Sequence, residues 1–228
     1  MSHSSSRLLR AKIRLASGEL SQVADTLWNH PAFASVYANY LFCNHAVVRA
    51  SVPVMRAALA AACGLPEDAV AAGLAEYLSE HIPEEIHHDD WLLEDIGVFG
   101  ISPAECWQRQ PPTSVATLVG AQYYWAAHVH PVAVLGYIAV LEGNPPDVAF
   151  VHRVSAKSGV PLAAFSTLLR HAEIDPFHRG ALDETLDRLP LTDAHTSLIG
   201  VSAFHSIHWL TRILYDAIAG AAISPESE

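Results

Sequence analysis

The residues best suited to chemistry form a histidine–acid–histidine motif, His171-Ala-Glu-Ile-Asp175-Pro-Phe-His178. Spacings of four and three residues place these three side chains on one face of a helix, across two turns. Leu168 and Leu182 extend the same stripe, so we expect the face to point into a core. Two imidazoles and a carboxylate facing an apolar interior are costly unless a bound partner satisfies them, and a divalent metal would do so. A polar surface stripe and hydrogen-bonded core histidines are the alternatives.

A second candidate is Glu84-Glu85-Ile-His87-His88, which contains two overlapping Glu-x-x-His pairs. A pair with this spacing lets one helix offer a carboxylate and an imidazole to the same metal centre. Apolar residues continue the face of Glu85 and His88 on both sides, whereas acidic residues share the face of Glu84 and His87. We therefore expect Glu85 and His88 to be the inward pair. Such pairs are common by chance, so this motif alone is weak evidence.

A third candidate is Glu142, which follows the uninterrupted apolar run from Pro131 to Leu141. A lone acid in this position can also be a helix end that meets water. Combining the three stretches gives the expected site residues: Glu85, His88, Glu142, His171, Asp175 and His178. Three carboxylates and three imidazoles from three helices suit two ferrous ions in a bundle core. The assembled site would carry a charge of about +1, which favours an anionic substrate group.

The composition of the chain argues against several classes of protein. The chain has 228 residues, of which 51% are hydrophobic and 16% charged, and this excludes a disordered or fibrous chain. A formal net charge of -11 argues against a nucleic acid partner. Three widely spaced cysteines imply no disulfide framework, and no apolar signal core follows the polar first residues, so we expect a cytoplasmic protein. The run from Pro131 to Leu141 is too short to span a membrane, so we expect no membrane segment.

Helical periodicity dominates the chain, and glycine and proline punctuate it. No repeat and no linker of domain-separating composition is evident, so we predict one all-α domain over residues 7–223, with flexible ends at 1–6 and 224–228. The expected helices cover 18–30, 32–62, 66–96, 103–109, 113–142, 147–157, 161–189 and 192–220.

The chain resembles a known family at these motifs. The resemblance rests on the segment from His81-Ile-Pro-Glu-Glu85 through His88 to Gly97, on the apolar run ending at Glu142, and on the motif of His171. In order and separation these segments are similar to those of the heme-oxygenase-like diiron oxidases and oxygenases, which are iron-containing redox enzymes. The similarity covers residues of about 75 to 190, and its last motif is the specific one.

The resemblance implies a seven-helix heme-oxygenase-like bundle without heme. It also implies a pair of Fe²⁺ ions, O₂ as co-substrate, and oxidation of a small molecule. Family activities include desaturation or C–C cleavage of fatty acids and amino acids, and N-oxygenation. Some members take their first carboxylate ligand seven residues before the histidine, and that position holds His81 here. His81 could therefore join or replace Glu85 as a ligand.

Pro176 interrupts the expected helix between two of the proposed ligands. Its ring removes a helical hydrogen bond and disfavours α geometry at Asp175. We therefore expect a bent or partly unwound segment there, mobile without metal and ordered when iron binds.

Several readings of function stay open on the sequence alone. The first is a diiron enzyme acting on a small biosynthetic metabolite, an amino acid, amine or fatty acid, with or without an external electron donor. The rivals are a thiaminase-like or cofactorless member of the same fold with a nucleophile such as Cys43, a ferritin-like iron store, and a non-catalytic iron-binding protein. A homodimer is a common state for compact helical enzymes and is compatible with each.

Overall fold

The computed structural model describes residues 4–143 and 147–221, and within these ranges the regular elements are all helical. The helices are α1 (Ser5–Ala16), α2 (Gly18–Trp28), α3 (Phe33–Cys63), α4 (Ala69–Glu85), α5 (His88–Gly97), α6 (Pro103–Gln108), α7 (Thr113–His128), α8 (Val134–Leu141), α9 (Val148–Ser158), α10 (Ser166–Arg188) and α11 (Asp193–Ala221). Two short 3-10 turns, η1 (Pro131–Ala133) and η2 (Leu162–Phe165), precede α8 and α10. The expected all-α class is confirmed, but the expected count of seven helices is wrong.

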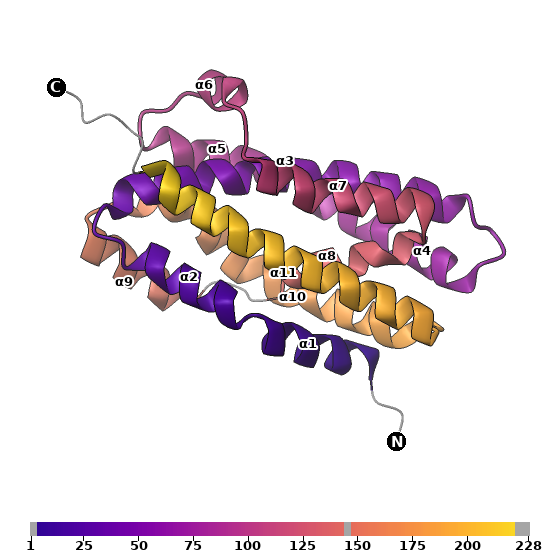
Figure 1. Ribbon diagram of the computed structural model, residues 1–228. Helices are drawn as coiled ribbons and strands as arrows, with labels where there is room; N and C mark the ends of the chain where they lie inside the picture. Colours follow the sequence, from indigo (N-terminus) through magenta and orange to yellow (C-terminus); the bar gives the residue numbers. More distant parts are fainter. Residues whose placement is uncertain (1–3, 144–146, 222–228) are drawn as a thin grey trace.

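The long helix α3 is the centre of the bundle. It packs against α4, α5, α7 and α11, and α8 lies mainly on α11 (Figure 1). Over an 18-residue window α3 reaches a mean hydropathy of 1.5, long and apolar enough to cross a membrane by length and composition. A search for uninterrupted apolar runs in the sequence does not identify this helix as a candidate membrane span. Helix α3 packs against four other helices, and a long apolar core helix also meets this criterion of length and hydropathy.

Several helices begin where the sequence provides a cap. Asp68 accepts hydrogen bonds from the N–H groups of Val70 and Ala71 and so caps α4. Ser102 and Glu105 form a capping box at the start of α6. Such caps satisfy backbone donors that a helix leaves without internal partners.

Two of the expected long helices are broken. The helix expected over 66–96 is two helices, because the backbone turns at His87, whose φ of 75° is left-handed. Glu85 therefore ends α4 and His88 begins α5. The helix expected over 113–142 stops at His128 and restarts through η1, where Pro131 occupies the first position. Proline disfavours helical geometry in the residue before it, which explains this second break.

The segment around Pro176 is the reverse case. The expected unwinding is wrong, since α10 runs without a break from Ser166 to Arg188. Pro176 itself is exposed, so its ring lies on the solvent side of the helix. The predicted ordering of this segment by iron stays a prediction.

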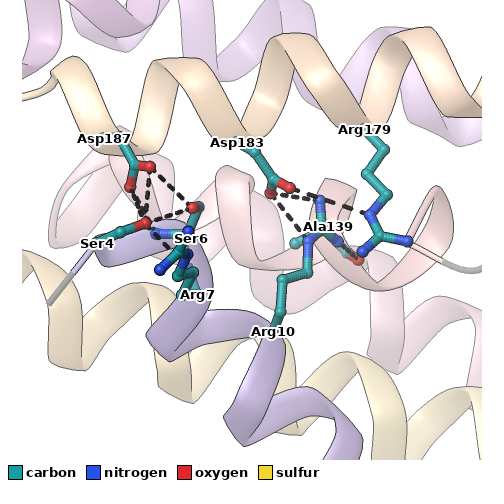
Figure 2. Close-up of polar contacts among 8 residues, drawn as sticks. All are labelled: Ser4, Ser6, Arg7, Arg10, Ala139, Arg179, Asp183 and Asp187. Atoms are coloured by element: carbon teal, nitrogen blue, oxygen red, sulfur yellow. Dashed lines mark hydrogen bonds and ion pairs between the residues drawn. The ribbon is translucent and has the colours of Figure 1, made fainter.

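The N-terminal helix α1 was missed by the sequence reasoning. Ser5 and Ser6 lie in its first turn and Ser4 caps it, where we had expected a loose end over 1–6. Asp187 of α10 explains the order, because it accepts hydrogen bonds from Ser4 Oγ at 2.7 Å and from the Ser6 N–H at 2.9 Å (Figure 2). Residues 1–3 and the expected loose end at 224–228 lie outside the described residues.

Close contact between α8 and α11 requires a residue without a side chain at Gly136. A Cβ atom there would lie 2.2 Å from the Ile199 carbonyl oxygen and 2.9 Å from Ser202 Cβ. Backbone oxygen cannot yield as a flexible side chain would. Gly136 thus fixes the distance of α8 from α11, and with it the position of Glu142 at the end of α8.

We expect Gly136→Ala to destabilise the fold by about 1–3 kcal/mol, the usual cost of overpacking. Gly120→Ala is the matched control, because a Cβ there meets nothing within 4 Å. It should instead stabilise α7 by about 0.5–1 kcal/mol through helix propensity. Urea denaturation measures both, and equal effects of the two variants would contradict the account of the α8–α11 contact.

Candidate metal centre

Four side chains converge where α4, α10 and the end of α8 meet. His81, Glu85, Glu142 and His178 each offer one atom that could bind a metal, and these atoms all lie within 4.8 Å of one another. The His81 Nε2 atom is 3.0 Å from Glu142 Oε1, and His178 Nδ1 is 3.2 Å from Glu85 Oε1. Glu142 and Glu85 keep only 12% and 10% of their side chains exposed. Two buried carboxylates this close to each other require positive partners.

The other three expected site residues lie beside this cluster. The Nδ1 atom of His88 is 3.1 Å from Glu85 Oε2, and the ring of His171 is 5.1 Å from that of His88 between centroids. Asp175 and His171 line one cavity together with Glu85 and Glu142. The structure therefore brings all six expected residues together, with His81 as a seventh member of the cluster.

The predicted directions of these side chains are confirmed in both motifs. His171 is partly buried, and Asp175 and His178 are buried on one face of α10. His88 is buried, whereas Glu84 and His87 are 58% and 76% exposed. The expectation that one helix carries both Glu85 and His88 is wrong, because the turn at His87 places them on two helices.

The hydrogen bonding of the cluster leaves ligand atoms unused. Among the described residues, the buried side-chain atoms without a hydrogen-bond partner include Glu85 Oε1, His88 Nδ1, Glu142 Oε2, Asp175 Oδ1 and His178 Nδ1. His88 Nδ1 and His178 Nδ1 instead lie in close ion pairs with Glu85, at 3.1 and 3.2 Å, whereas Asp175 Oδ1 has neither kind of partner. A buried polar atom without any partner costs about 1–3 kcal/mol. Metal–ligand bonds of about 2.1 Å would place neighbouring ligand atoms about 3 Å apart, and the pairs His81–Glu142, His88–Glu85 and His178–Glu85 have this spacing. The donor set thus fits one or two divalent ions.

The protonation of His171 is set by its own helix. Its Nδ1 atom donates to the Thr167 carbonyl oxygen at 2.8 Å. In a neutral imidazole the proton on Nδ1 leaves the lone pair on Nε2, and a hydrogen bond of this kind is the usual support for a metal-binding histidine. Burial lowers the pKa of His171, which keeps the ring neutral.

Burial also governs the carboxyl groups. It raises the pKa of Asp175 to about 7, with the charge of Glu142 adding to the effect. Burial likewise raises the pKa of Glu142, against the hydrogen bond with His81. Burial opposes the charged form of His81 too, yet the Glu142 carboxylate outweighs it and raises the pKa of His81 to about 9. Protons therefore fill the place of cations here, and metal binding would release them.

The sequence reasoning missed the residue that orients α5 and α10. Asp95 is fully buried on α5 and accepts hydrogen bonds from Ser166 N–H, Ser166 Oγ and Thr167 N–H, at 3.0, 2.6 and 3.0 Å. These bonds cap the start of α10. They fix the turn that carries His171 against the helix that carries His88. Nothing in the sequence distinguishes Asp95 from the other acidic residues, and only these hydrogen bonds show its role.

A second missed residue, Arg10, joins α1 to α8, which ends next to Glu142, and to α10. Its Nη1 atom donates to the Ala139 carbonyl oxygen at 2.9 Å, in the last turn of α8, and its Nε atom donates to Asp183 of α10 at 2.9 Å (Figure 2). Gly143 permits this approach, because a Cβ there would lie 2.8 Å from Arg10 Nη1. Arg10 is a positioning residue for the turn that presents Glu142.

A separate group, Asp68, His130 and His195, also meets the geometric criterion for a metal site. However, His130 Nδ1 accepts the Val132 N–H at 3.1 Å, and His195 Nδ1 accepts the Thr192 N–H at 3.3 Å. A neutral ring that accepts at Nδ1 carries its proton on Nε2 and has no lone pair left there for a metal. The His130 Nε2 atom instead donates to Asp68 at 3.3 Å. This group links the starts of three helices.

The cysteines lie outside the cavity. Cys43 and Cys106 are buried and Cys63 is exposed, and none of the three is among the residues that line it. Burial raises the pKa of the Cys43 thiol to about 12. Cys106 contacts His45 Nδ1 at 3.6 Å, and burial raises its pKa as well.

Comparison with known proteins identifies the architecture. The chain superimposes on a crystal structure of a domain of unknown function with a heme oxygenase-like fold from Shewanella denitrificans, with a TM-score of 0.78 and 18% identity over 95% of this chain and 93% of that one. The fold is heme oxygenase-like. The chain also superimposes on the crystal structure of a TenA homolog from Pseudomonas syringae, with a TM-score of 0.71 and 12% identity over 93% of this chain and 92% of that one. No protein-family model and no curated protein matches the sequence.

We expect Arg10→Ala to weaken metal binding by about tenfold, because the turn that presents Glu142 loses its support. Asp187→Asn is the matched control. It removes one of the two acceptor oxygens in the other attachment of α1 to α10 and leaves the Ala139 carbonyl capped. Anaerobic competition against a coloured chelator measures the affinity for Fe²⁺. Equal losses in the two variants, or none in Arg10→Ala, would contradict the positioning role.

We also expect acid to weaken the link at His130. Burial lowers the pKa of His130, against the hydrogen bond with Asp68. The unfolded chain then binds this proton at higher pH than the folded one, so the contribution to stability is complete above about pH 6.5 and is lost below it. His130→Gln keeps polar contacts but cannot titrate. Its unfolding free energy should fall less than that of the wild type between about pH 7 and pH 5; an equal fall in urea titrations would refute this.

Proposed function

We propose that this chain is a non-heme diiron enzyme that uses O₂ to oxidise a small biosynthetic metabolite. The observation that carries the proposal is the cluster of buried ligand atoms that make no hydrogen bond, on Glu85, His88, Glu142, Asp175 and His178, beside a cavity that three of these residues line. Carboxylates and imidazoles are the ligands of such iron sites. When bound, the two ferrous ions would supply electrons for the reduction of O₂, which side chains alone do not provide.

The protein groups divide the remaining tasks. His81 and Glu142 form one pair and Glu85, His88 and His178 another, so the carboxylates are held by imidazoles from three helices. His171 presents a neutral ring. Asp175 carries an unpartnered Oδ1 on the cavity wall, and a carboxyl with a pKa near 7 can bind or release a proton at that atom.

Aromatic and aliphatic side chains cover two sides of the site. Trp91 stacks on His88 with ring centroids 4.1 Å apart, and the guanidinium of Arg170 covers Trp91 from outside at 4.9 Å. On the other side the cavity is walled by Val48, Met55 and Leu168. Apolar walls of this kind reduce the access of water and so strengthen electrostatic interactions at the site.

The cavity also holds polar groups for a substrate. Ser51 Oγ and Tyr137 OH are hydrogen-bonded at 3.1 Å, and both are buried in its wall. Their placement suits a substrate group that donates or accepts one hydrogen bond. A thiaminase-like enzyme with a cysteine nucleophile is less well supported, because the three cysteines do not line this cavity.

Anaerobic titration with Fe²⁺, followed by admission of O₂, tests the proposal. We expect about two irons per chain and rapid O₂ uptake in proportion to bound iron. His178→Ala should lose both. His208→Ala is the matched control, since His208 is exposed on α11 and contacts only Trp209 among the aromatic rings.

Other outcomes would assign the chain elsewhere. Continued accumulation of iron well beyond two per chain would indicate a store, and bound iron without O₂ uptake would indicate a binding protein. An activity that survives removal of metal and disappears with Cys43→Ala would indicate the thiaminase-like alternative.

A further inference from the structure

The cavity at the metal centre is small. Its volume is about 200 Å³, whereas ligand sites usually occupy about 300–1,000 Å³. Part of its wall is taken up by the carboxylates and His171, which would face the metal ions. The space that remains is too small for most metabolites, so the rest of a substrate needs further room.

A second cavity adjoins it. This chamber also has a volume of about 200 Å³ and lies among α2, α3, α8 and α11. Tyr40, Asn44 and Leu141 line both cavities, so the two cavities meet at these three residues, which we call the partition. Tyr40 and Asn44 are partly buried and belong to α3, and Leu141 is the residue before Glu142. Together the two cavities reach the usual volume of a ligand site.

The chamber beyond the partition is aliphatic. Apart from the partition, its described lining consists of Leu20, Val47, Val140, Leu210, Ile213 and Leu214. Such a surface is poorly hydrated, and each methylene group transferred to it from water gains free energy. A hydrocarbon chain is therefore the ligand portion that fits.

The charges of both cavities limit the other end of the substrate. Among the described residues that line them, none is a lysine or arginine. An anionic group far from the metal centre would face an apolar lining without a cationic partner, which is unfavourable. A free amino acid, with charges of both signs, would leave one of them unpaired. The single polar end of the substrate must then lie at the carboxylate and histidine cluster.

We propose that the substrate is a molecule with one polar end at the metal centre and an unbranched aliphatic chain that passes Tyr40, Asn44 and Leu141 into the second chamber. This inference rests on the proposed function and names its substrate class. Leu210 and Leu214 of α11 set the length of chain that the chamber accepts.

Binding of a homologous series tests the inference without iron or O₂. Straight-chain carboxylates from butanoate to dodecanoate, with matched alcohols and amines, are titrated calorimetrically into the purified chain, metal-free and loaded with Zn²⁺. We expect affinity to rise about fourfold for each added methylene until the chamber is full, and then to level off. The three head groups show which polar end the site prefers.

Leu214→Trp should fill the chamber, so that long chains lose affinity while butanoate binds as before. Leu210→Phe, at a second partly buried position, should give the same result to a smaller extent. Leu15→Trp is the matched control, because Leu15 is 84% exposed on α1. Circular dichroism confirms that each variant is folded.

Three results would overturn the inference: no dependence on chain length, tighter binding of free amino acids than of the series, or equal losses for short and long chains in Leu214→Trp. The last would make the chamber an entrance and not a place for the chain. Each readout is binding alone. Failure of the iron and O₂ experiment would therefore leave this result standing, and the reverse also holds.

Discussion

Burial of like charges is the constraint on which the structure depends. Glu85, Glu142 and Asp175 lie in an apolar bundle where a carboxylate is unstable without a positive partner. Imidazoles from α4, α5 and α10 lie next to these carboxylates, yet several of the ligand atoms make no hydrogen bond. A core that needed only stability would hold aliphatic residues in these places, since replacing buried ion pairs by hydrophobic residues is often neutral or favourable. The arrangement is stable only in the presence of cations, as protons or as metal ions.

Much of the scaffold serves to hold these elements in register. Asp95 fixes the start of α10 against α5, Gly136 fixes α8 against α11, and Arg10 ties the end of α8 to α10. Each of these contacts involves a backbone group: the Thr167 N–H, the Ile199 carbonyl oxygen and the Ala139 carbonyl oxygen. Helices carry their side chains with little freedom once the backbone is fixed, so contacts distant in sequence determine the spacing of the ligand atoms.

The residues of the site could be predicted from the sequence, but the contacts that position their helices could not. The 4 and 3 spacing on α10 sufficed to place His171, Asp175 and His178 on one buried face, because helical periodicity is a local property. Contacts such as that of Arg10 with Ala139 join residues 129 positions apart, and no local pattern identifies them. The same limit explains the missed helix α1, whose order depends on Asp187. The broken helix at His87 was missed because its apolar face continues across the turn.

That turn has a consequence for the geometry of the cluster. With His87 in a left-handed conformation, the α4 hydrogen-bond ladder ends before α5 begins, so the segments bearing Glu85 and His88 are separate rigid bodies joined by a short connection. The turn therefore lets Glu85 and His88 approach each other from two different helix axes, with His88 Nδ1 at 3.1 Å from Glu85 Oε2.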